Sequence, residues 1–154
     1  MLPKTMQELD AIRDECYSMV TNRSTASAAA AIVPVPGVDI AADVALLLDT
    51  IPSINNRFGL SQEQINKLDP QTKKLILVAI KGIGSNLIAK TITKEMIVQV
   101  LKTVGVRLAT KQVAKYIPFI GSAVAATLSF TAMKYVGNSH VDDCYNVAKR
   151  IISK

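Results

Sequence analysis

Residues 28–43 read AAAAIVPVPGVDIAAD, and the predicted fold depends on how this stretch is interpreted. Small and apolar residues lead into two prolines and a glycine, after which a helical pattern begins again. Each proline lacks a backbone donor and restricts the residue before it, so neither a helix nor an inner strand continues through VPVPG. We therefore predict a sharp corner at 33–37 that turns one apolar helix back against the next.

A second corner of the same kind occurs later in the chain. The stretch YIPFIGSAVAATLSFTA resembles IVPVPGVDIAADVALLL, since both run from apolar residues through Pro and Gly into an alanine-rich helix. Two such corners would place their helices side by side in a core. One pair is no repeat array, so the echo predicts an architecture of packed helices and not a solenoid.

Helical spacing governs almost all of the remaining sequence. Apolar residues near the start recur every three or four positions, as expected for one face of a helix: Met6, Leu9, Ile12, Cys16 and Met19. Capping signals mark three helix starts, at Thr5 with Glu8, at Ser61 with Gln64, and at Asp69 followed by proline.

Proline and glycine, which interrupt or end helices, set the remaining expected boundaries. We expect Pro52 to kink or interrupt a helix that begins near Asp39, and Gly59 and Gly137 to end helices. Ser139 with Asp142 then indicates the start of a last helix that reaches about Ile152. No convincing alternating strand is found, so the sequence predicts an all-α fold, a compact bundle of about six or seven helices.

Length and composition favour one domain with a packed core. The chain has 154 residues, of which 49% are hydrophobic, with few aromatics and no tryptophan. We expect a single domain over 1–154, made of an N-terminal helix (1–23) and a helical bundle (24–152). Two cysteines provide no disulfide framework, and the polar start MLPKTMQELD contains no signal peptide, so a cytoplasmic location is expected.

Two apolar segments leave a membrane-spanning interpretation open. Eighteen uncharged residues separate Lys115 from Lys134, close to the minimum for crossing a bilayer. The alternative function is therefore an integral membrane helical-hairpin protein that inserts residues 24–51 and 116–136. Prolines, glycines and hydroxyl side chains within these segments favour burial inside a bundle of helices.

Charge is distributed unevenly along the chain. The net charge is +6, yet residues 1–66 hold four basic and eight acidic residues, whereas 67–154 hold fourteen and four. From Lys73 to Lys115 there are nine basic residues and one acid, Glu95. Such a stretch could contact an anionic membrane or pair with the acidic first half. No aromatic platform accompanies the lysines, so nucleic acid is not an expected partner.

The sequence contains little that matches known catalytic motifs. No P-loop string is present, and KGIGSN at 81–86 has its glycines and lysine in the wrong order for one. Asp39 and Asp43 share a helix face, but capping and pairing with a lysine explain them more simply. His140 and Cys144 have a spacing that can bind zinc, although two ligands do not complete a site. We therefore expect no catalytic residues, no metal and no cofactor in this chain.

The long segment 94–116 is the one candidate for a binding surface. Ile97, Leu101, Val104 and Leu108 form an apolar stripe that either packs into the core or lies on a membrane. Basic residues surround or continue this stripe, and they are the expected membrane-contact residues: Lys94, Lys102, Arg107, Lys111 and Lys115.

These motifs, taken in order, resemble a known family. AIVPVPGVDIAADVALLLDTIPSINNRFGLS at 31–61, ITKEMIVQVLKTVG, AKYIPFIGSAVAATLSF and the final VDDCYNVAKRI resemble the C-terminal helical domain of the immunity-related (interferon-inducible) GTPases. ELDAIRDEC at 8–16 resembles a helix late in that family's GTPase domain. The similarity covers roughly residues 24–152, without the residues that would hold GTP.

The resemblance implies a function as well as a fold. It implies a dynamin-like protein of innate immunity that self-associates or contacts a GTPase domain and attaches peripherally to intracellular membranes. GTP and Mg²⁺ would be cofactors only of a GTPase domain located elsewhere. In some members the membrane helix, which would match about 94–117 here, has lipidated cysteines beside it; this chain has none there, so lysines and apolar contacts would have to suffice.

Overall fold

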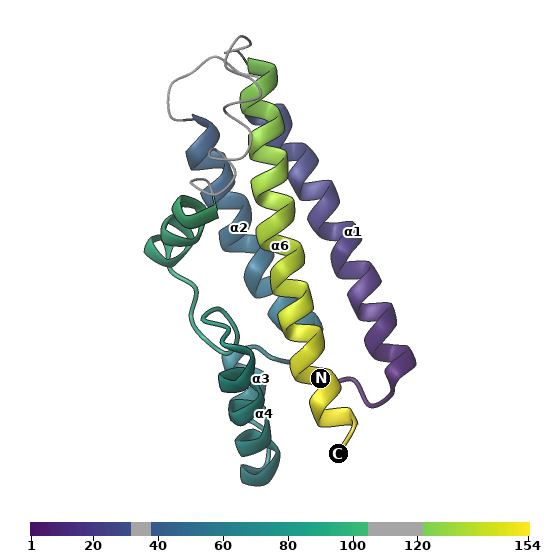
Figure 1. The fold of residues 1–154 in the computed structure, drawn as a ribbon. Coiled ribbons are helices and arrows are strands. Elements are labelled where there is room, and N and C mark those ends of the chain that lie inside the picture. The colour runs from purple at the N-terminus through teal and green to yellow at the C-terminus, as the bar shows by residue number, and fades with distance from the viewer. Residues whose placement is uncertain (32–37, 105–121) are drawn as a thin grey trace. The chain divides into compact units, whose positions relative to one another are not determined.

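The computed structural model contains helices and no strand in the part of the chain that it describes, residues 1–31, 38–104 and 122–154. Side chains are described for 1–26, 43–104 and 130–154. Five helices are labelled in Figure 1: α1 (Met6–Ala31), α2 (Val38–Arg57), α3 (Gln62–Asn66), α4 (Pro70–Ile83) and α6 (Ser122–Ile152). Residues 94–104 are helical as well. The all-α prediction is confirmed, and both predicted corners lie outside the described residues.

The expected six or seven helices compare with five labelled helices in the described residues, and two predicted boundaries are absent. α1 runs without a break through residues 23 and 24, and α6 runs through Gly137 and Ser139. A Cβ added at Gly137 would lie 2.5 Å from Cγ1 of Val20. Gly137 therefore allows α6 to approach α1 closely, and it does not end a helix.

The capping signals at Ser61 and Asp69 and the helix end at Gly59 are found where the sequence predicts them. Ser61 and Gln64 form a complete capping box at α3, and the Asp69 carboxylate accepts hydrogen bonds from the Gln71 and Thr72 amides at α4. Gly59 and Gly84 follow the ends of α2 and α4 with positive φ angles of 72° and 79°. Pro52 does not interrupt α2, in which Ile51 and Ile54 are fully buried.

The chain divides into two compact units, each built from parts of α1, α2 and α6. Unit 1 comprises Met1–Ser18, Ile51–Ile92 and Asn138–Lys154, and unit 2 comprises Met19–Thr50 and Thr93–Gly137. Each unit has a buried apolar core. The larger fully buried side chains of unit 1 include Leu9, Ile54, Phe58, Leu60, Ile76 and Ile88.

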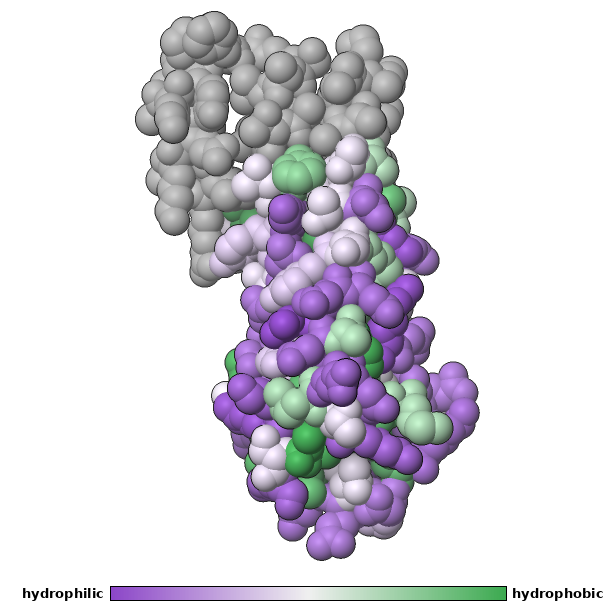
Figure 2. Space-filling view, turned by 90° about the vertical axis from the view of Figure 1, so that its right-hand side faces the viewer, coloured by the Kyte–Doolittle hydropathy of each residue, from purple (hydrophilic) through white to green (hydrophobic). Residues whose placement is uncertain are grey.

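Close packing and polar contacts of Arg23 join the helices of unit 2. Val20 packs against Gly137, and Leu47, Ile97 and Met133 are buried. The Arg23 guanidinium of α1 contacts both the Asp49 carboxylate and the Thr50 hydroxyl of α2. On the face shown in Figure 2, the described residues present small apolar patches among hydrophilic side chains.

Candidate functional site

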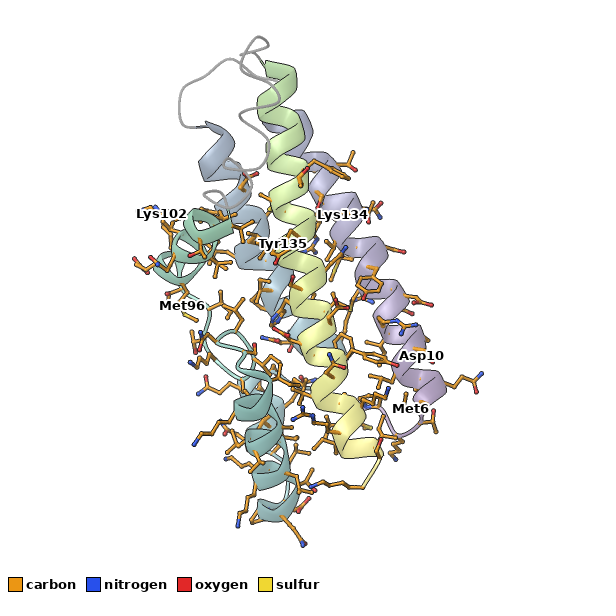
Figure 3. All side chains as sticks on the ribbon, viewed as in Figure 1. Met6, Asp10, Met96, Lys102, Lys134 and Tyr135 are labelled. Atoms are coloured by element: carbon orange, nitrogen blue, oxygen red, sulfur yellow. The ribbon has the colours of Figure 1, made fainter. Side chains whose placement is uncertain are left out.

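Two of the five predicted membrane-contact residues lie on described helix. Lys94 and Lys102 are exposed on the segment 94–104, while Ile97 and Val104 of the same segment are buried. Figure 3 labels Lys102 and Met96 on this segment. Arg107, Lys111 and Lys115 lie outside the described residues. The described half of the predicted helix thus buries part of its apolar stripe and leaves its lysines in water.

A buried polar cluster in unit 1 is the most distinctive group of reactive side chains. It joins α2 to α6 through Asn55, His140 and Cys144, which are at most 2% exposed. His140 Nε2 lies 2.8 Å from the Asn55 Oδ1, and the Cys144 thiol lies 3.5 Å from the same oxygen. The Asn55 amide nitrogen donates to the carbonyl of Leu87, 3.0 Å away. Asn55 is therefore the centre of the cluster.

The hydrogen bonds fix the tautomer of His140. Because the Asn55 amide nitrogen donates to Leu87, its Oδ1 accepts, and Nε2 of His140 carries the proton. Nδ1 is buried without a partner in the described residues. Burial lowers the pKa of His140 to about 4, since an imidazolium here would have no acceptor for its second proton.

The cluster combines residue types that occur in cysteine nucleophile sites, but its environment opposes that chemistry. Burial raises the pKa of the Cys144 thiol well above its ordinary value, with smaller contributions from Asp143 and Cys16. Burial also raises the pKa of Cys16 to about 11. A nucleophilic cysteine requires the opposite shift and access for a substrate. These thiols stay protonated near neutral pH, and the cluster acts as a polar tie between helices.

The acids beside His140 and Cys144 do not join them. Asp142 is exposed and accepts a hydrogen bond from the hydroxyl of Tyr17 on α1. Burial raises the pKa of the neighbouring Asp143, as does the charge of Asp142. Within the side chains that the structure describes, no group of three or more His, Cys, Asp or Glu residues could hold a metal ion.

Sequence reasoning noticed His140 and Cys144 but missed their partner Asn55. Asn55 stands 85 residues from His140, so no local spacing links them. The available signal was an asparagine at an apolar position of a helix, next to Ile54 and three residues before Phe58. Asp43, the second predicted carboxylate, is largely buried on α2, and the side chain of Asp39 lies outside the described residues.

The buried imidazole makes stability depend on pH. His140 has a folded-state pKa of about 4 and an ordinary value of 6.5, so between these values the unfolded chain takes up a proton that the folded chain refuses. We expect the free energy of unfolding to decrease as the pH is lowered through this window. At pH 5 this one group should reduce it by about 2 kcal/mol relative to neutral pH.

The measurement is urea unfolding from pH 7.5 to 4.5, for the natural chain and for His140→Gln. The glutamine amide can still donate to Asn55 but does not titrate in this range. Carboxylates contribute equally to both curves, so their difference isolates His140. Parallel curves for the two proteins would contradict the assignment.

Comparisons with known proteins identified no similar protein. The chain matches no protein-family model, no curated protein and no solved structure at a significant level. Among the described residues, no helix combines the length and the apolar character required to cross a bilayer.

Proposed function

We propose that this chain is a non-catalytic helical module that acts through protein association and through peripheral attachment to anionic intracellular membranes. The observation that carries the membrane part is the segment 94–104, in which Lys94 and Lys102 are exposed on the same helix that buries Ile97. Lysines on a helix anchored by its apolar side are suited to contacts with acidic headgroups.

Two further observations support this proposal. The basic residues between Lys73 and Lys115 outnumber the acids by nine to one. The ordered motifs resemble those of the helical domain of immunity-related GTPases, and on that resemblance the module would work with a GTPase domain in innate immunity. Burial keeps the thiols of Cys144 and Cys16 protonated near neutral pH, so these two cysteines give no support to a catalytic alternative.

The test is sedimentation with vesicles that contain phosphatidylserine, compared with vesicles of phosphatidylcholine alone. We expect binding to the anionic vesicles only, and weaker binding at high salt because counterions screen the lysines. Reversing Lys102, Arg107, Lys111 and Lys115 to glutamate should abolish binding while the circular dichroism spectrum is retained.

The matched control reverses four lysines outside that basic stretch, Lys4, Lys67, Lys134 and Lys149, and changes the net charge equally. It should retain most of the vesicle binding. Equal loss in both variants would show that net charge alone decides binding, and would contradict the assigned surface. Protein that stays in cell membranes through a carbonate wash would instead favour the inserted hairpin of residues 24–51 and 116–136.

A further inference from the structure

A groove in unit 1 lies between α4 and the last turns of α6. It encloses about 740 Å³. Its apolar walls come from Leu75, Val78 and Ile83 on one side and from Ile151 on the other. Asn146, Lys149, Arg150 and Lys154 complete the α6 side.

The outer face of α4 extends this apolar surface into solvent. Val78 and Leu77 are 61% and 49% exposed, and both are among the few large hydrophobic side chains that the described residues expose. Lys74 and Lys81 are spaced three and four residues from them, so the four share one helix face. An apolar patch framed by cations is typical of a surface that binds a partner.

Charge limits the class of partner. The segments 70–83 and 144–154 carry six basic residues and no acid: Lys73, Lys74, Lys81, Lys149, Arg150 and Lys154. The ion pairs found in the described part of the chain involve Arg13, Arg23, Arg57 and Lys67, and none of these six. Lys73 contacts the amide oxygen of Asn66, and Lys149 lies over the ring of Tyr145. The groove is therefore complementary to an anionic occupant with an apolar side.

We propose that this groove binds an acidic amphipathic helix of a partner protein. Apolar side chains at helical spacing would fill the space along Leu75, Val78 and Ile151, and carboxylates beside them would meet Lys81, Arg150 and Lys154. A recessed apolar floor favours a helix over a flat lipid surface, and its aliphatic walls offer no stacking platform for nucleic acid. This inference rests on the association part of the proposed function and is independent of the membrane part.

The probe is a fluorescein-labelled peptide about 18 residues long, with leucines at spacings of three and four and glutamates on its other face. We expect its anisotropy to rise on titration with the full chain, and the affinity to fall with salt. A peptide with glutamine in place of each leucine tests the apolar part. A peptide with lysine in place of each glutamate tests the charge. Neither should bind.

Val78→Glu should weaken binding of the acidic peptide at least about tenfold, because it places a carboxylate in the groove. Since Val78 is mostly exposed, the variant should fold normally, which urea unfolding checks. Met6→Glu is the matched control, an exposed apolar residue on α1 outside the groove, and it should bind like the natural chain.

The outcomes separate this inference from the vesicle result. Equal binding of the leucine and glutamine peptides, or full binding by Val78→Glu, overturns the groove assignment and leaves the membrane surface untouched. Loss of vesicle binding in Val78→Glu, together with no binding of the acidic peptide, would assign the groove to lipid and also overturn the inference.

Discussion

Replacing Asn55 with alanine is expected to lower the free energy of unfolding by about 3–4 kcal/mol, the largest effect of a single substitution that we predict. The Asn55 side chain accepts from His140, 2.8 Å away, and donates to the Leu87 carbonyl, 3.0 Å away. Its removal leaves a buried imidazole N–H and a backbone carbonyl without partners, and it opens a cavity. A domain of this size is stable by only about 5–15 kcal/mol, so the loss is large.

Urea unfolding followed by circular dichroism measures this effect. Two further variants show whether the lost hydrogen bonds cause it. Asn56→Ala changes the exposed neighbour and should alter stability by less than about 0.5 kcal/mol. Asn55→Leu keeps the volume but loses the hydrogen bonds, and it should remain strongly destabilised. Should Asn55→Leu prove as stable as the natural chain, the hydrogen bonds of the cluster would contribute nothing net.

This cluster shows where sequence reasoning reaches its limit. Local signals act over three or four residues, and they located the capping box at Ser61, the cap at Asp69 and the helix end near Gly59. The class of fold follows from the same period. The partners of His140 do not, because Asn55 joins it only after α2 and α6 have packed together.

The candidate binding surfaces also divide into what the sequence predicts and what only the packing of the helices determines. Periodicity placed lysines and an apolar stripe on the segment 94–104, where Lys94 and Lys102 are indeed exposed. It did not identify the groove at Val78, because the sequence of α4 fits a helix with either side buried. Only the packing of Ile76 and Ala79 into the core determines that Leu77 and Val78 face outward.

Gly137 is the position where tertiary contact overrides a local signal, and its replacement by alanine is our second large prediction. In an exposed helix the change would stabilise by up to about 1 kcal/mol. Here the new Cβ would lie 2.5 and 2.8 Å from the two γ carbons of Val20, a stiff β-branched side chain. We expect the overpacking to dominate and to lower the free energy of unfolding by about 2–3 kcal/mol.

A double-mutant cycle with Val20→Ala tests the mechanism. Val20→Ala alone should destabilise by about 2 kcal/mol, since it empties a buried position. The loss of unfolding free energy in the double variant should be smaller than the sum of the two single losses by about 2 kcal/mol. The reason is that the new methyl group occupies the space that the valine leaves. Gly82→Ala is the control, since its Cβ would meet only the mobile end of Arg150, and it should be neutral or stabilising. Additive losses in the cycle would mean that Gly137 serves α6 alone and not its contact with α1.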